Sequence, residues 1–317
     1  MSRLRPLGVA TGCAALALAL LAASPATAVA PPLSDPHVLV HFDPALGQLA
    51  ENIALEPDGS ADVTFIGARQ VARVGLDGSV TVRATLPPPT DPDTPVVHFP
   101  AATGLARAED GTLYIGYATG DELAGVWRLT PGGDLTQLAG IPNSLINGLT
   151  LDEHKGTVYA ADSGRGVVWR VSTATGEASV WASGADLEPA GFVGANGVRK
   201  HHGAIWVSNS DKGTVLRIPI CPDGTSGPVE TRITGLDGID DFGFTSFKDD
   251  ALLAALNTSS RVAYVTADGV ASIVLTAADG LSNPTSVAVD EHRVYVTSAS
   301  FFATPQDPNL LLARLDQ

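Results

Sequence analysis

The chain has 317 residues, of which 44% are hydrophobic and 17% charged, a composition typical of a globular protein and not of a disordered one. Its 34 acidic and 19 basic residues give a formal charge of −15, which argues against nucleic acid or an anionic membrane surface as a partner. The 33 glycines and 22 prolines are spread between short apolar runs, as expected for many strands joined by tight turns.

Residues 1–28 are typical of a secretory signal peptide. Arg3 and Arg5 give a positively charged start, an apolar run follows over Ala14–Ala22, and Ala26–Ala28 offers a small-residue cleavage site. The apolar run is shorter than the roughly 20 residues that a membrane-spanning helix needs, and no later stretch qualifies. The sequence therefore predicts a secreted protein in which Cys221 is the one remaining cysteine, so that no internal disulfide can form.

One unit recurs six times along the chain. Its clearest copy, INGLTLDEHKGTVYAADSGRGVVWRV from Ile146, reads as a strand, a turn, a second strand, a glycine turn and a third strand. The copies are spaced by about 45 residues, and several are followed by a fourth strand, which is typical of β-propeller blades. We predict an all-β fold over residues 29–317, a six-bladed β-propeller with four-stranded blades. The copies begin at Glu51, Thr103, Asn147, Asn196, Asp241 and Thr285.

The sixth unit lacks a fourth strand before the chain ends. The segment His37–Asp43, HVLVHFD, precedes the first unit, and we expect it to supply the missing outer strand and close the ring. A two-layer β-sandwich is the alternative for so many strands, but it does not account for six copies at one period. Pro87–Pro100 and Leu187–Val193 are expected to be loops over one face, and no helical pattern occurs outside the signal peptide.

The first residue of each unit is expected to lie at the mouth of the central channel, because the innermost strand of each blade lines that channel. All six residues carry a side-chain oxygen, and oxygen is the donor that Ca²⁺ prefers, with about six to eight ligands. Two carboxylates would balance its charge, and two amide oxygens would leave room for water or substrate. We predict one Ca²⁺ here, with other divalent cations left open; its ligands would be Glu51, Asn147, Asn196 and Asp241.

Further polar and aromatic side chains are expected around this opening, because the second strand of each blade ends on the same face. Candidate substrate-binding residues are Thr103, Thr285, Tyr117, Asp162, Asn209 and His98, with Asn257 and Phe301 or Phe302 also at the rim. Asp162 and Asn209 are equally typical of turns, so both roles stay open for them. The pair His201 and His202 falls in a turn on the opposite face; it could bind a metal, although a solvated turn is the commoner explanation.

Taken in order, Glu51, the Asn-Gly pairs at Asn147 and Asn196, and Asp241 resemble the heads of the blades in the gluconolactonase, regucalcin and luciferin-regenerating-enzyme family, with the paraoxonases more distant. The resemblance extends from Glu51 to about Ser300. It implies a six-bladed propeller with one divalent cation, usually calcium, at the channel mouth, and hydrolysis of a lactone or an ester. The four residues match metal-binding positions, but regucalcin-like members carry Asp where Asn196 stands.

The mechanism that the resemblance implies uses the cation as a Lewis acid that polarises the substrate carbonyl. Thr103 stands where paraoxonases carry a histidine that is often assigned as the base. Asp241 is therefore the candidate base for water, with Asp240 second, because alternation along an extended strand predicts that the Asp240 side chain points away from the channel.

Two other functions stay open beside this secreted hydrolase of a lactone, an ester or another natural product. The phrases ADSGRGVVWRV, IPICPDGTSGPVE and GIDDFGF are similar to fungal propellers linked to natural-product biosynthesis, some of them associated with hetero-Diels–Alder cyclisation. Such a cyclase would need a wide, apolar channel mouth. A binding propeller without turnover is the third possibility, because fold does not dictate function. We expect a monomer in each case.

Overall fold

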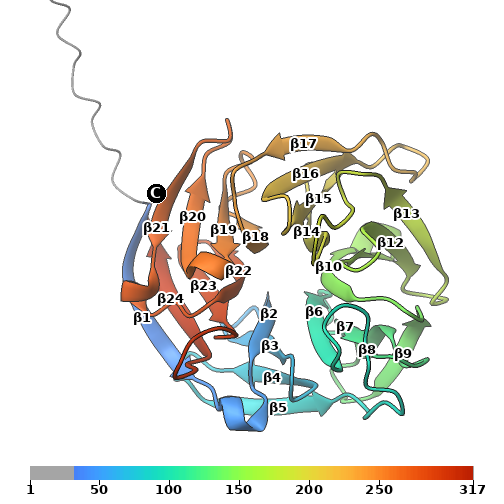
Figure 1. Cartoon of the computed structure of the whole chain (residues 1–317), viewed down its shortest axis with the longest axis horizontal. Helices are drawn as coiled ribbons and strands as arrows, with labels where there is room; N and C mark the ends of the chain where they lie inside the picture. The colour runs from blue at the N-terminus through green and yellow to red at the C-terminus, as the bar shows by residue number, and fades with distance from the viewer. Residues whose placement is uncertain (1–31, 317) are drawn as a thin grey trace, which may run out of the picture. The chain divides into compact units, whose positions relative to one another are not determined.

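The computed structural model describes residues 32–316. Six antiparallel, four-stranded sheets form blades around a central axis (Figure 1). The predicted six-bladed propeller is therefore confirmed, and the sandwich is excluded. The described residues contain no α-helix, and their 3-10 helices are η1 (Pro44–Leu46), η2 (Glu153–Lys155), η3 (Asn257–Ser259) and η4 (Ala277–Asp279). The predicted signal peptide lies outside the described residues.

Each of the first five blades consists of four consecutive strands, from innermost to outermost (Figure 1). Blade one has β2 (Ala50–Leu55), β3 (Ala61–Phe65), β4 (Gln70–Val74) and β5 (Val80–Thr85). Blade two has β6 (Ala101–Arg107), β7 (Leu113–Ala118), β8 (Gly125–Leu129) and β9 (Leu135–Gly140). Blade three has β10 (Ile146–Asp152), β11 (Thr157–Asp162), β12 (Val167–Ser172) and β13 (Ala178–Ser183). Blade four has β14 (Ala195–His201), β15 (Ala204–Asn209), β16 (Thr214–Pro219) and β17 (Glu230–Ile233). Blade five has β18 (Ile239–Phe244), β19 (Leu252–Leu256), β20 (Arg261–Val265) and β21 (Ala271–Leu275).

Blade six closes the ring with both ends of the described chain. Its inner strands are β22 (Pro284–Asp290), β23 (Arg293–Ser298) and β24 (Asn309–Leu315). The outermost strand is β1 (Leu33–His41), which pairs antiparallel with β24. This confirms the expectation that the segment before the first repeat completes the last blade, and the sheet edge of β24 is thereby covered.

Apolar side chains hold neighbouring blades together. Trp206 of blade four is fully buried and packs in one cluster with Phe242 and Leu252 of blade five. Blades three and four share another cluster, which contains Trp181 and Ile205. Because Cys221 is free, the ring is stabilised by this packing without a disulfide in the described residues. None of the helices in residues 32–316 has the length and apolar character needed to cross a membrane.

A bulge at the start of each innermost strand sets which side chains reach the channel mouth. In blade four, Ala195 pairs with Asn209 and regular pairing resumes only at Val198, so that the two strands are locally out of step. Blade five has the same shift between Ile239 and Phe242. The residue of blade five in register with Asn196 is therefore Asp240, one position earlier than the sequence alignment indicated.

Candidate metal and substrate site

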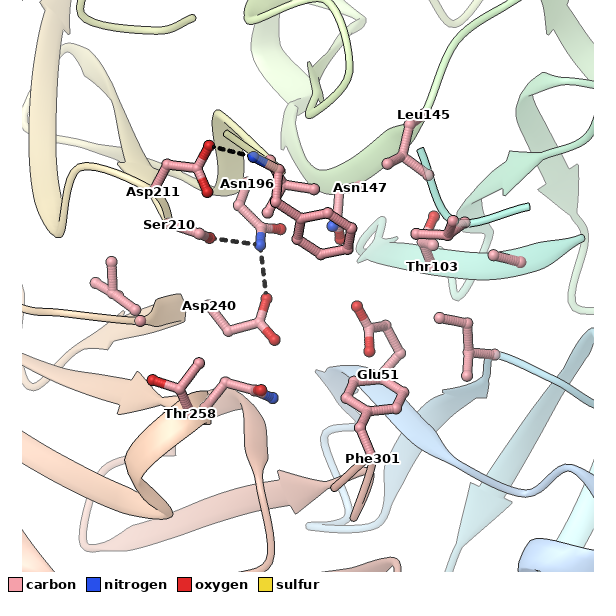
Figure 2. A pocket seen from close by; sticks show the side chains of 18 of the residues that line it. Glu51, Thr103, Leu145, Asn147, Asn196, Ser210, Asp211, Asp240, Thr258 and Phe301 are labelled. Carbon is pink, nitrogen blue, oxygen red and sulfur yellow. Dashed lines mark hydrogen bonds between the residues drawn. The ribbon is translucent and has the colours of Figure 1, made fainter. Parts of the chain in front are cut away.

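A cavity of about 440 Å³ opens at the channel mouth (Figure 2). Five blades contribute the first unpaired residue of their innermost strand to its lining: Glu51, Thr103, Asn147, Asn196 and Asp240. Four of these five were predicted from the sequence to lie at the mouth. The Thr103 hydroxyl also donates a hydrogen bond of 2.5 Å to the carbonyl oxygen of Ile146 on the neighbouring β10, which ties the starts of two inner strands together.

Two buried carboxyl groups, those of Glu51 and Asp240, point toward one another across the cavity (Figure 2). Glu51 is only 5% exposed, and its Oε2 has no hydrogen-bond partner within residues 32–316. Burial, together with the nearby charge of Asp241, raises the pKa of Glu51 to about 8. Burial also raises the pKa of Asp240 well above its usual range, and the charge of Glu51 adds to that shift. Buried carboxylates are costly without a positive partner, so this pair is suited to a cation.

Asparagine side chains supply neutral oxygens beside the two acids. The Asn196 amide nitrogen donates to Asp240 Oδ1 at 2.8 Å and to the Ser210 hydroxyl at 2.9 Å, so that the amide oxygen is available as an acceptor. Asn147 is half-buried, lines the cavity and forms no side-chain hydrogen bond with the described residues. The donor set thus consists of oxygens alone, which fits a hard divalent cation better than zinc or copper.

Asp241, predicted as a metal ligand and base, does not line the cavity. Its Oδ2 accepts hydrogen bonds from Arg199 at 2.5 Å, from Ser286 at 2.7 Å and from Asn52 at 3.3 Å. The prediction that Asp240 points away from the channel is wrong, because strict alternation fails through a bulge. Asp240 takes the position that the sequence assigned to its neighbour, and the guanidinium of Arg199 neutralises Asp241 beside the cavity.

The remaining predicted substrate-binding residues have structural contacts outside the cavity. Tyr117 is buried, and its hydroxyl donates to a backbone carbonyl at 2.7 Å. Asp162 and Asn209 each accept a backbone N–H three residues on, as turn residues do, and both also bind the backbone of the loop before their blade. His98 is exposed and contacts a loop aspartate, while the Thr285 hydroxyl donates to the backbone of blade one.

Apolar side chains form most of the cavity wall, and the sequence indicated few of them. They come largely from the loops before blades two and four and from the ends of second strands: Ile66, Val97, Phe99, Leu145, Phe192, Val193, Phe301 and Phe302. Phe302 is 71% exposed and Phe192 is 58% exposed, so both stand at the entrance. Asp211 fixes the Phe192 loop, because its Oδ2 accepts three consecutive backbone N–H groups at 2.7–2.8 Å.

Comparison with known proteins shows which solved structures share this architecture. No family model matches the sequence, and no curated protein sequence matches it. A solved putative gluconolactonase superposes with a TM-score of 0.64 at 14% identity, covering 88% of this chain and 91% of that one. Regucalcin from Agrobacterium tumefaciens, described as a calcium-binding protein, gives 0.62 at 17% identity, covering 85% and 92%. The chain has the fold of the gluconolactonase and regucalcin propellers.

A third solved structure shows that this fold is shared more widely. Virginiamycin B lyase from Staphylococcus aureus, solved with quinupristin, has a TM-score of 0.57 at 13% identity, covering 87% of this chain and 98% of that one. At such identities the likeness establishes the fold, while chemistry has to be argued from the residues of the site. In this gluconolactonase-like propeller, those residues are two facing buried acids, two amides and an apolar wall.

Proposed function

We propose that the protein is a secreted, divalent-cation-dependent hydrolase of lactones or esters, and that the cation is Ca²⁺. The observation that carries this proposal is the pair of buried acids, Glu51 and Asp240, with one Glu51 oxygen left without a partner among the described residues. The shared fold with solved gluconolactonase structures supports it. Secretion rests on the signal-peptide pattern of residues 1–28. The expectations of a monomer and of no nucleic-acid partner stay predictions.

The cavity residues would have different roles in such a hydrolase. Glu51, Asn147, Asn196 and Asp240 would hold the cation, which when bound supplies a Lewis acid for the substrate carbonyl. Within residues 32–316, the Asp240 side chain is hydrogen-bonded only through Oδ1, so that Oδ2 is the candidate acceptor for the proton of the attacking water. The apolar wall would bind the rest of the substrate and exclude bulk water, which favours lactones or esters with an apolar substituent.

The apolar entrance is also the feature that the non-hydrolytic cyclase hypothesis expects. That hypothesis, however, gives no role to two buried acids that face one another. Binding of a cation explains why both acids lie there. Product analysis separates the two functions, because hydrolysis consumes water and opens the ring or splits the ester, whereas a cyclisation does neither. If the protein bound such compounds but released them unchanged, the third hypothesis, a binding propeller without turnover, would hold.

Removal of the cation is the direct test. We expect the mature protein to hydrolyse members of a panel of lactones and aryl esters, and to lose at least about 100-fold in rate after exhaustive chelation. Addition of Ca²⁺ should restore the rate, while circular dichroism shows that the chelated protein stays folded. Rates that survive complete metal removal would reject the proposed mechanism.

Replacement of Phe302 by Ala should reveal which part of the substrate the entrance binds. Burying a phenylalanine side chain against substrate is worth about 1.5–3 kcal/mol when complete, and Phe302 starts from 71% exposure. We therefore expect kcat/KM to fall about tenfold for substrates with long apolar substituents and to change little for short ones. Phe247→Ala is the matched control, because Phe247 is 89% exposed and lies outside the cavity. An equal loss for long and short substrates would contradict an apolar contact.

A further inference from the structure

A second cluster of ligand-type side chains lies at the end of β14 remote from Asn196. His201 is the last residue of β14, His202 follows it in the turn, and Asp250 belongs to the loop before β19 of blade five. One ligand atom from each residue can be chosen so that all three lie within 4.8 Å of one another. The sequence favoured a solvated turn for the histidine pair, but His201 is only 3% exposed.

The distances from Asp250 to the two histidines are close to those between ligand atoms around a tetrahedral metal ion. Asp250 Oδ1 lies 3.0 Å from His202 Nδ1 and 3.4 Å from His201 Nε2. Metal–nitrogen and metal–oxygen bonds of about 2.0–2.2 Å place tetrahedral ligand atoms roughly 3.3–3.6 Å apart. The three ligand atoms are therefore near enough to one another to bind one ion after local adjustment.

Hydrogen bonding orients His202 as a ligand. Its Nε2 lies 2.9 Å from the carbonyl oxygen of Phe247, and a carbonyl can only accept, so Nε2 carries the proton. In the neutral ring Nδ1 then presents a lone pair to the Asp250 carboxylate at 3.0 Å. Two acceptors at this distance need a proton or a cation between them. A backbone carbonyl that fixes the second ring nitrogen is the usual support for a metal-bound histidine.

His201 is held rigidly beside this pair. Its ring stacks on Phe244 and lies against the His202 ring, with centroids 3.8 Å apart in both cases. By the same reasoning its Nε2, 2.9 Å from the Asp249 carbonyl oxygen, carries a proton and donates to that oxygen. Binding of a metal at Nε2 would move this proton to Nδ1 and would leave the carbonyl as a nearby oxygen donor.

We propose that His201, His202 and Asp250 bind a transition-metal ion, with Zn²⁺ as the ion that two imidazoles and one carboxylate fit best. The site would fasten the turn of blade four to the loop of blade five, at the end of β14 away from the cavity. It is distinct from the all-oxygen site of the proposed hydrolase and does not depend on that function.

Zinc binding by the mature protein tests this proposal, with Ca²⁺ in excess so that the oxygen site is saturated. Titration against a chromophoric chelator should show one tight Zn²⁺ site. Asp250→Asn and His202→Asn should weaken it by more than about 100-fold, because even a residue that only supports a ligand costs about 10–100-fold when lost. Both variants spare the buried His201, and asparagine tolerates the positive φ of His202. His154→Asn, in the corresponding turn of blade three, should leave the affinity unchanged.

Co²⁺ in place of zinc reports the coordination geometry. We expect the intense visible absorption of tetrahedral Co²⁺ in the wild type and in His154→Asn, and its loss in both cluster variants. Zn²⁺ should also raise the melting temperature of the wild type but not of those variants, whose own cooperative melting shows in the same experiment that they fold. Wild-type zinc affinity in Asp250→Asn and His202→Asn, or no tight zinc site in the wild type, would leave only a His–Asp ion pair and overturn the proposal.

Discussion

Glu51→Gln should reduce kcat/KM for lactone or ester hydrolysis on the order of 10³-fold, about 4 kcal/mol of transition-state stabilisation. The substitution keeps the size of the side chain but removes one of the two carboxyl groups that face each other in the cavity (Figure 2). It also replaces the buried Oε2, which no described residue hydrogen-bonds, by an amide group that cannot balance a divalent cation. Steady-state kinetics, together with Ca²⁺ binding measured by isothermal titration calorimetry, checks both consequences.

Companion variants make the expectation specific to the cavity. Asp240→Asn should produce a loss similar to that of Glu51→Gln, since it removes the other facing acid. Asp162→Asn should leave the Ca²⁺ affinity unchanged, because Asp162 is buried at the end of β11 and lies outside the cavity. If Glu51→Gln retained both Ca²⁺ binding and activity, the all-oxygen site would have no part in the chemistry.

The repeated sequence carried most of the fold. Each blade is one copy of the same unit, and the apolar strands of one blade bury those of the next. The length of the repeat and the number of blades can therefore be read from the sequence. The same period brought Glu51, Thr103, Asn147 and Asn196 to one rim. The closure of the ring by β1 could also be predicted, because the sixth repeat lacks its fourth strand.

Side-chain direction was harder to predict where the backbone departs from regular strand geometry. In GIDDFGF, two adjacent acids occupy the bulge, and only the pairing of Ile239 and Phe242 with β19 shows which of them enters the cavity. Aligning Ile239 with Ala195, the residue before each bulge, would have identified Asp240. The polar residues at the ends of second strands were predicted to bind substrate, but Asp162 and Asn209 instead accept hydrogen bonds within their own turns.

The apolar wall and the buried histidine depend on contacts between repeats, which the period does not encode. Phe192 reaches the entrance because Asp211, on the turn after β15, binds the backbone of its loop. His201 is buried because Phe244 and the loop of the next blade cover it. Such contacts join segments whose lengths differ from blade to blade, so they could be found only in the folded ring.

Arg199→Met should destabilise the propeller by about 3 kcal/mol, the largest stability loss that we expect from one side chain near the site. The Arg199 guanidinium forms a hydrogen bond of 2.5 Å with Asp241, whose side chain is almost fully buried. Methionine keeps much of the apolar stem but leaves the carboxylate without its counter-charge, and an unpaired buried charge is costly. Chemical denaturation at neutral pH measures the loss as a lower midpoint with an unchanged slope.

A second substitution separates the ion pair from simple packing. In Arg199→Met combined with Asp241→Asn, no uncompensated charge remains, so we expect at least half of the lost stability to return. The oxygen of the introduced amide would still accept hydrogen bonds from the neighbours that now bind the carboxylate, Ser286 among them. If the double variant were instead less stable than Arg199→Met, the loss would come from packing around the arginine stem. If the stability returned, Asp241 would be a structural acid whose charge is balanced by Arg199. Asp240 would then be the acid that is available to a cation.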